Sequence, residues 1–149
     1  MQHPARTPKV LAPGEGKAVM VLGDAISFKM TGEETGGAYC ILEVVSPPEG
    51  GPPRHVHSRE DEAFYILEGS FEFQVDGRKI AAGAGSFVFG PRDVPHTFKN
   101  VGSAPGKMLL VVQPAGIEKF FEQISLLPPG PPDFAKIAAL AGEYGIAFV

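Results

Sequence analysis

The sequence predicts an all-β fold, a small antiparallel barrel or sandwich followed by short helices. Short runs rich in β-branched and aromatic residues recur along most of the chain, and glycine or proline separates them. Polar and apolar side chains alternate over residues 71–75, and Asp76-Gly77 behind them is a favourable two-residue hairpin turn. Near Gly116 the apolar spacing changes to the helical period.

Strands are expected at the runs that combine high β propensity with flanking turn residues. These runs are Ala18–Leu22, Ala25–Met30, Ala38–Val45, Ala63–Glu68, Phe71–Val75, Arg78–Ala81, Ser86–Phe89, Thr97–Asn100 and Lys107–Val112. A chain of 149 residues suits one domain with a substantial core. We therefore expect a flexible N-terminal arm at 1–16, a barrel at 17–114, and a C-terminal helical extension with a terminal strand at 115–149.

The C-terminal extension combines two amphipathic segments with a proline-rich linker. Helical spacing relates Ile117, Phe120, Phe121 and Ile124. After the stiff linker at 127–132, Asp133 is placed to cap a second helix. The apolar tail at 146–149 has two possible uses, as an edge strand or as a contact with a partner. We favour the partner, because exposed apolar termini are unfavourable in a monomer.

His55, His57, Glu62 and His96 form a complete set of ligands for a divalent transition metal. Because side chains alternate along a strand, His55 and His57 point to the same side. Glu62 has the opposite parity, but the polar run at 58–61 can supply a loop that resets the register. His96 follows a turn-rich stretch and opens a distant strand, which implies a curved or closed sheet.

The ligand types restrict the metal. Mixed nitrogen and oxygen ligation suits iron, manganese, nickel, copper or zinc, whereas magnesium and calcium prefer oxygen ligands. We expect one such ion per chain. Cys40 is the only cysteine, which excludes a cysteine-based zinc site, and it is expected to be a buried thiol. His3 lies in the N-terminal arm and is not expected to bind the metal.

The two ligand blocks keep a characteristic spacing. His55-Val-His57 is followed after four residues by Glu62 and after six more by Gly69. The second block places Gly85, Pro91, His96 and Asn100 in order. These blocks resemble the two signature motifs of the cupin superfamily, and the resemblance covers about residues 50–100. It implies a small antiparallel jelly-roll barrel in which the four residues bind one metal. Two motif glycines fall on Glu49 and Asp93, both at expected turns.

The same region looks like the single-domain, quercetin-dioxygenase-like cupins. That resemblance implies a metal-dependent dioxygenase acting on a small aromatic or enolisable substrate, with Glu62 as both ligand and general base. A redox-neutral isomerase, cyclase or decarboxylase and a non-catalytic small-molecule binding protein are the alternatives. By strand parity, Phe64 and Ile66 with Glu62, and Phe98 with His96, are expected to line an apolar substrate pocket. Phe87 and Phe89 are expected in the barrel core.

Charge and hydropathy restrict the partners. The net charge of −4 and the lack of a lysine or arginine cluster argue against nucleic acid. The apolar run at 19–22 is too short for a signal core or a membrane span, so we expect a cytoplasmic protein. The likeness to small bacterial cupins implies a homodimer.

Overall fold

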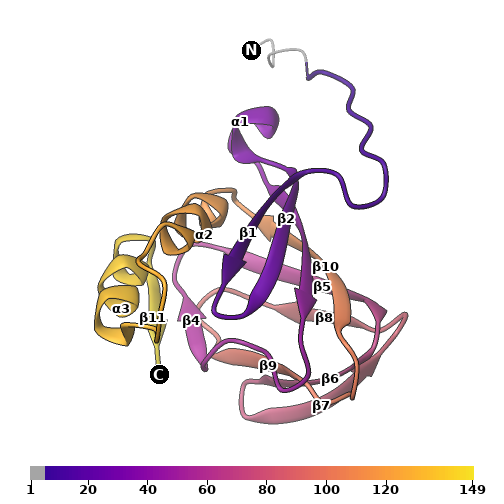
Figure 1. Cartoon of the computed structure of the whole chain (residues 1–149), viewed down its shortest axis with the longest axis vertical. Helices are drawn as coiled ribbons and strands as arrows, with labels where there is room; N and C mark the ends of the chain where they lie inside the picture. The colour runs from indigo at the N-terminus through magenta and orange to yellow at the C-terminus, as the bar shows by residue number, and fades with distance from the viewer. Residues whose placement is uncertain (1–5) are drawn as a thin grey trace.

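Two antiparallel sheets form the body of the protein, which a computed structural model describes over residues 6–149 (Figure 1). The larger sheet has the strand order β1-β2-β3-β10-β5-β8 and the smaller one β11-β4-β9-β6-β7. The strands are β1 Lys17–Val21, β2 Asp24–Met30, β3 Cys40–Ser46, β4 His55–His57, β5 Asp61–Glu68, β6 Ser70–Val75, β7 Arg78–Gly83, β8 Phe87–Gly90, β9 His96–Asn100, β10 Gly106–Gln113 and β11 Ile146–Phe148. This architecture confirms the predicted all-β jelly-roll class.

The core lies between the two sheets and follows from strand alternation. In β3 every second residue is buried, and Phe71 and Phe73 of β6 point inward in the same way. Phe64 of the larger sheet meets Phe73 of the smaller one at 5.1 Å between ring centroids. Phe98 packs against Phe73 at 5.7 Å. The first pair is edge-to-face and the second is tilted, so aromatic rings from both sheets pack against one another in the core.

Within the described part of the chain, three helices flank the sheets: α1 Gly32–Thr35, α2 Ile117–Ser125 and α3 Phe134–Glu143. The first is short and was not expected from the sequence. The apolar side of α2 packs on β1 and buries Ile117 and Phe120. As predicted from the linker, Asp133 caps α3, because its side chain accepts a hydrogen bond from the backbone N–H of Lys136.

A buried glutamate connects α1 to the beginning of α2. Glu118 accepts hydrogen bonds from the backbone N–H groups of Gly32 and Gly116, each at 2.8 Å. A carboxylate that accepts several backbone donors can be buried at moderate cost. This contact helps to fix α2 against the larger sheet.

The C-terminal tail forms an edge strand of the smaller sheet, so the favoured expectation of a partner contact for this tail was wrong. Strand β11 pairs with β4, with Ile146 opposite His57 and Phe148 opposite His55 (Figure 1). The tail buries Ile146 within its own chain, which reduces the apolar exposure that motivated the expectation, although Val149 remains 61% exposed.

Two aromatic residues differ from their expected positions. Phe87 and Phe89 are 63% and 50% exposed, whereas Val88 between them is buried. The expectation that they lie in the core was wrong, because side chains alternate along β8. Val88 points inward, so the two phenylalanines point outward. Cys40 is fully buried, as expected, and burial raises the pKa of its thiol.

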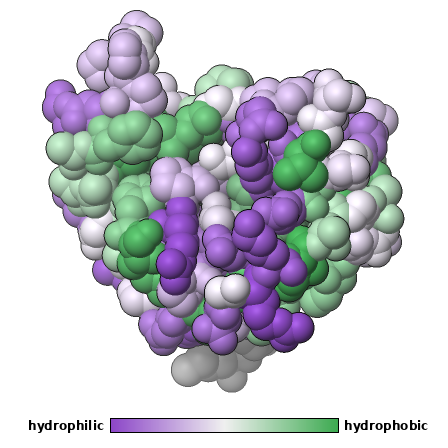
Figure 2. Space-filling model, turned by 90° about the horizontal axis from the view of Figure 1, so that it is seen from below, coloured by the Kyte–Doolittle hydropathy of each residue, from purple (hydrophilic) through white to green (hydrophobic). Residues whose placement is uncertain are grey.

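The N-terminal segment contacts α1 through side chains. Arg6 donates a hydrogen bond to the carbonyl oxygen of Thr35, and Lys9 pairs with Glu34 at 2.8 Å. His3 lies outside the described residues. On the face seen in Figure 2, hydrophilic side chains form a central band between hydrophobic ones. Within residues 6–149, no helix is long and apolar enough to cross a membrane.

Candidate metal centre

Two neighbouring strands of the smaller sheet carry the three histidines. His55 and His57 lie on β4, separated by one residue, and His96 begins β9, where it pairs directly with His55. His57 and His96 are 2% and 1% exposed, and His55 is half-buried. Antiparallel pairing therefore brings the three imidazoles together, although His55 and His96 are 41 positions apart in the sequence.

Glu62 reaches the histidines from the other sheet. Strand β5 begins at Asp61, so the intervening loop changes the register and turns Glu62 inward. Asp61 binds the guanidinium of Arg92 through both carboxylate oxygens, at 3.1 Å each, and also accepts the Arg92 backbone N–H. The backbone N–H of Asp93 donates to the carbonyl oxygen of His57 at 2.7 Å. The loop before His96 is thus fixed to both β4 and β5.

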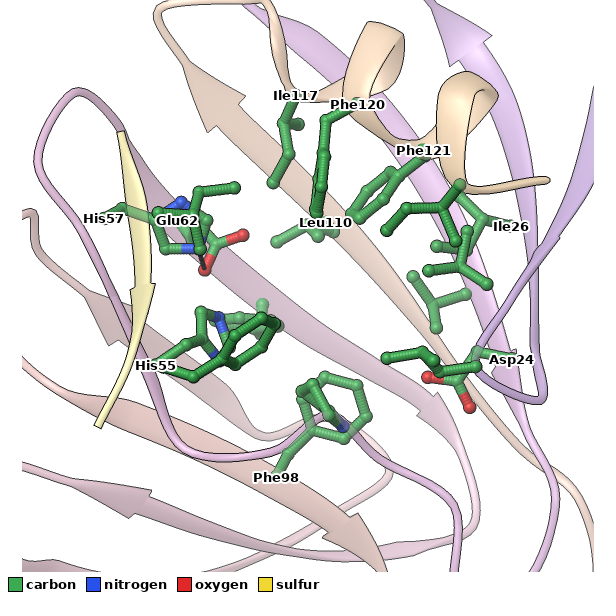
Figure 3. Close-up of a pocket in the computed structure, with 18 residues that line it drawn as sticks. Asp24, Ile26, His55, His57, Glu62, Phe98, Leu110, Ile117, Phe120 and Phe121 are labelled. Atoms are coloured by element: carbon green, nitrogen blue, oxygen red, sulfur yellow. Dashed lines mark ion pairs between the residues drawn. The ribbon is translucent and has the colours of Figure 1, made fainter. Parts of the chain in front are cut away.

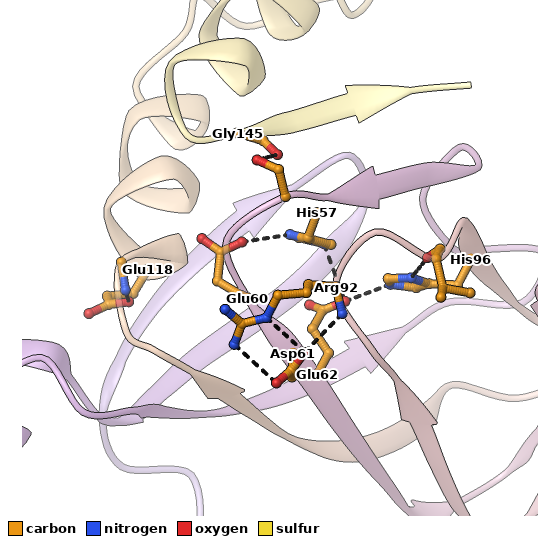
Figure 4. Close-up of polar contacts among 11 residues, drawn as sticks. His57, Glu60, Asp61, Glu62, Arg92, His96, Glu118 and Gly145 are labelled. Atoms are coloured by element: carbon orange, nitrogen blue, oxygen red, sulfur yellow. Dashed lines mark hydrogen bonds and ion pairs between the residues drawn. The ribbon is translucent and has the colours of Figure 1, made fainter.

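The structure brings together all four predicted ligands. One ligand atom from each of His55, His57, Glu62 and His96 lies within 4.8 Å of the others. Figure 4 shows three of them, His57, Glu62 and His96. The Glu62 carboxylate oxygen Oε2 is 2.6 Å from Nε2 of His96 and 3.2 Å from Nε2 of His57. These donor atoms suit a single transition-metal ion.

The outer nitrogen of each imidazole already has an acceptor. Nδ1 of His55 lies 2.9 Å from the carbonyl oxygen of Pro53, and Nδ1 of His96 lies 3.2 Å from that of Val94. Nδ1 of His57 lies 3.1 Å from the carboxylate of Glu60. In a neutral imidazole, a donor at Nδ1 leaves the lone pair on Nε2. These acceptors favour a proton on Nδ1, so that with a bound ion all three rings would present Nε2 as a ligand.

One atom that is fully shielded from solvent has no hydrogen bond in this arrangement. Among residues 6–149, Nε2 of His57 is the only fully shielded side-chain nitrogen or oxygen without a hydrogen-bond partner. Buried polar atoms in proteins almost always have one. Its position beside Glu62 and His96 fits a ligand atom that faces an ion, so the residues present fit a divalent transition metal.

Burial and neighbouring charges have opposite effects on the pKa values of the clustered residues. Burial raises the pKa of Glu62, but attraction to His57 and His96 outweighs burial and lowers it overall. Burial by itself lowers the pKa of His57, whereas Glu62 and Glu60 raise it to about 9. Burial lowers the pKa of His55 to about 4 in spite of Glu62. The metal-free cluster therefore holds an ionised carboxylate beside a protonated His57.

Glu60 is a site residue that the sequence pattern did not reveal. The polar run at 58–61 predicts a loop there, but Glu60 is only 4% exposed and its carboxylate contacts Nδ1 of His57. A carboxylate behind a histidine ligand orients the ring and increases its basicity. Its spacing of three residues from His57 was the available signal, although this spacing alone does not distinguish an inward from an outward side chain.

An apolar cavity opens onto the ligand cluster (Figure 3). His55, His57 and Glu62 lie in its wall, as do the predicted pocket residues Phe64 and Phe98. Ile66 does not line the cavity, so its expected place in the pocket was wrong. It is fully buried, and because a strand advances about 6.6 Å in two residues, it lies beyond Phe64 in the core.

The C-terminal extension supplies much of the remaining cavity wall. Its contribution comes from α2 and β11, which the sequence pattern did not place at the pocket. The residues are Ile117, Phe120, Phe121, Ile124, Ile146 and Phe148. The ring of Phe148 also stands against that of His55, with 6.5 Å between centroids. The extension therefore limits the access of water to the ligand cluster.

Comparison with known proteins agrees with this geometry. Residues 42–112 match the family model described as a cupin domain. The chain is 30% identical to an uncharacterized protein of Methanocaldococcus jannaschii over 74 residues. The aligned region is 50% of this chain and 59% of that protein. It is 24% identical to quercetin 2,3-dioxygenase of Bacillus subtilis over 63% of this chain and 28% of the enzyme. These matches cover less than two thirds of either relative.

Solved structures share the fold. KdgF from Halomonas sp. superposes with a TM-score of 0.66 at 17% identity, over 76% of this chain and 99% of that protein. The polyketide cyclase RemF from Streptomyces resistomycificus gives a TM-score of 0.64 at 24% identity, over 72% of this chain and 80% of the cyclase. These likenesses concern the fold, and a shared fold does not determine a reaction.

We expect Glu60→Gln to weaken metal binding about 10- to 100-fold, because the neutral amide orients and polarises His57 less well. Chelator-competition titration with Zn²⁺ or Ni²⁺ measures the affinity. His96→Ala, which removes a ligand, should lose stoichiometric binding. The control is Glu68→Gln, because Glu68 is an exposed carboxylate outside the ligand cluster. Its ion-pair contact is with Lys107, at 3.9 Å. Unchanged affinity in Glu60→Gln would contradict the assigned role.

Metal affinity should rise with pH between about 6.5 and 9. The pKa of His57 is raised to about 9 in the metal-free protein, so below this pH the ion must displace a proton. One displaced proton corresponds to about a tenfold gain in affinity per pH unit. Calorimetry in buffers of different ionisation enthalpy measures the released proton. Affinity that is constant over this range would contradict ligation by His57.

Proposed function

We propose that this chain, which carries a cupin domain at residues 42–112 and belongs to the cupin superfamily, is a metal-dependent dioxygenase. Its substrate would be a small aromatic or enolisable molecule that offers adjacent oxygen atoms. His55, His57, Glu62 and His96 would hold one divalent ion of iron, manganese, nickel, copper or zinc. Such an ion supplies a Lewis acid and, for the redox-active metals, electron transfer to dioxygen.

The observation that carries this proposal is the position of the ligand cluster in the wall of an apolar cavity. A structural metal site is closed by its ligands, whereas a catalytic one keeps access to substrate. Here His55, His57 and Glu62 line the cavity, so a molecule in it meets the ligand cluster directly. Phe64 and Phe98 beside them are 2% and 8% exposed and would keep water from the reacting atoms.

Glu62 is the proposed catalytic residue. Its carboxylate is 3% exposed and faces both His57 and His96. A substrate hydroxyl that enters the cavity would transfer its proton to a Glu62 oxygen and become an oxyanion. The three histidines are held by their Nδ1 contacts and do not need to move during this transfer.

The size of the cavity favours a small substrate. Its volume is about 80 Å³. This lies well below the roughly 300–1,000 Å³ of common ligand pockets. A dihydroxybenzene or a short diketone fits this space more readily than a flavonol does.

A redox-neutral cyclisation, isomerisation or decarboxylation is the second candidate. The likeness to RemF supports it, as does a 27% identity over 60% of the chain to the protein named polyketide synthase CurC from Streptomyces cyaneus. Proton transfer by Glu62 and Lewis-acid polarisation would serve such reactions without dioxygen.

Glu62→Gln should decrease turnover about 10²- to 10⁴-fold, since it retains an oxygen ligand but removes the base. Oxygen uptake is measured with iron-, manganese-, nickel- and copper-loaded protein on dihydroxyaromatics, diketones and flavonols. Glu43→Gln is the control, because Glu43 does not line the cavity. Metal content is determined for each variant, so that a loss of turnover is separated from a loss of metal.

Three results distinguish the candidates. Oxygen consumption that disappears in Glu62→Gln supports the dioxygenase. Product formation under nitrogen supports the redox-neutral class. Tight ligand binding without turnover under either atmosphere contradicts both and indicates a binding protein.

We also propose a homodimer formed through the outer face of β5 and β8. Tyr65, Phe87 and Phe89 are 47%, 63% and 50% exposed there, and Tyr65 pairs directly with Phe87. Strand β8 is at the edge of the larger sheet. An exposed apolar patch beside a free strand edge favours pairing with the same face of a second copy.

Phe87→Lys with Phe89→Lys should convert this dimer to a monomer, because lysines on facing patches repel each other and are costly to bury. Light scattering coupled to size-exclusion chromatography gives the mass. Met20→Lys is the control, since Met20 is 59% exposed but lies on β1 at the other edge. A monomeric wild-type protein would exclude the dimer.

A further inference from the structure

A second polar group lies in the cavity, away from the metal centre. Asp24, at the beginning of β2, lines the same cavity as His55 and Glu62 and is only 7% exposed. Figure 3 shows the Asp24 carboxylate on the side of the cavity opposite His57 and Glu62. Among the described lining residues, every side chain other than the metal ligands and Asp24 is apolar. The cavity is thus an apolar space with one polar group at each end.

Asp24 is incompletely paired within the chain. One carboxylate oxygen, Oδ1, accepts a hydrogen bond from the hydroxyl of Ser46. Over residues 6–149, the other oxygen has no hydrogen-bond donor and the carboxylate has no cation within ion-pair distance. Burial raises the pKa of Asp24 to about 6, and the Ser46 hydrogen bond only partly opposes this.

Such a carboxylate is costly for the fold. An ionised group in an apolar wall loses hydration that one hydroxyl donor does not replace. Asparagine would accept the same hydrogen bond from Ser46 without a charge, so packing does not require the acid. A buried carboxyl group without a cation at the wall of a cavity is typical of a functional site.

We propose that Asp24 binds a hydrogen-bond donor, an ammonium or hydroxyl group, on the end of the ligand remote from the metal centre. The free carboxylate oxygen accepts the donor, and Ser46 holds the other oxygen in place. A ligand with an apolar middle and a donor at its far end would match the cavity at both ends. Asp24 is thus a specificity-determining residue. This inference rests on the proposed function for one point only, that the other end of the ligand chelates the metal.

Three probes that differ at one group test this inference. They are catechols that carry an ethyl, a hydroxyethyl or an aminoethyl group para to one hydroxyl. Binding is measured by calorimetry at neutral pH under nitrogen, on zinc-loaded and on metal-free protein. A hydrogen bond to a charged group contributes enough to change affinity about 10- to 100-fold. We therefore expect both donor-bearing probes to bind that much more tightly than the ethyl probe.

The variants assign this preference to Asp24. Asp24→Ala should bind all three probes with equal affinity, and Asp24→Asn should lose the preference for the ammonium. Ser46→Ala should keep the preference, because the carboxylate remains. Glu43→Gln is the matched carboxyl-to-amide control, since Glu43 lies on β3 outside the cavity lining. It should behave as the wild type does.

Thermal stability separates ligand binding from a structural role. If Asp24 anchors ligands, Asp24→Asn should melt at the same or a higher temperature than the wild type at neutral pH, because no charge is buried. Equal affinities of the three probes in the wild type, or no binding up to millimolar concentration, would overturn the inference. A stability loss in Asp24→Asn with unchanged selectivity would do the same.

The two proposals fail in different ways. A preference for donor-bearing probes that persists in metal-free protein supports the role of Asp24 even when no metal-dependent turnover is found. Metal-dependent turnover with no difference among the probes leaves the dioxygenase in place and overturns the role of Asp24.

Discussion

The arrangement of the site depends on three hydrogen bonds at the outer nitrogens of the histidines. A free imidazole exchanges its proton between two nitrogens, but an acceptor at Nδ1 fixes the proton there and turns the lone pair of Nε2 inward. Pro53, Glu60 and Val94 provide these acceptors. Each precedes or follows a ligand strand by only a few residues, so the loops, rather than the strands, set the ring orientation.

The remaining structure keeps these loops in place. Gly51 has a φ of +148°, and a Cβ there would overlap the carbonyl oxygen of Phe98. The chain before β4 can therefore approach β9 closely only with glycine. Glu49 and Asp93, at the two positions where the motif has glycine, have φ of 67° and 65°. Strand β11 then pairs with β4 on its other side, so β4 is held from both edges although it has only three residues.

Local patterns predicted the parts of the structure that depend on local geometry. The alternation in β6, the turn at Asp76 and the ligand spacing were sufficient for the strands and for the identity of the four clustered residues. The roles of Glu60, Ile66, Phe87 and the tail were not predictable in this way. Each depends on which face a short segment turns toward a distant partner, and a shift of one residue in a strand reverses that face. The cavity wall likewise depends on the packing of α2 against β1, which no local period specifies.

Discrimination between ligands has to come from the polar groups of this cavity. An apolar pocket distinguishes molecules that differ by one methylene only about 10- to 200-fold, whereas a buried polar group that is left unpaired excludes the wrong ligand far more strongly. The metal centre would recognise any small chelating molecule. Asp24 adds a second requirement at the other end, because a ligand without a donor leaves its carboxylate desolvated and unpaired. An apolar space between two such groups selects for length as well as for chemistry.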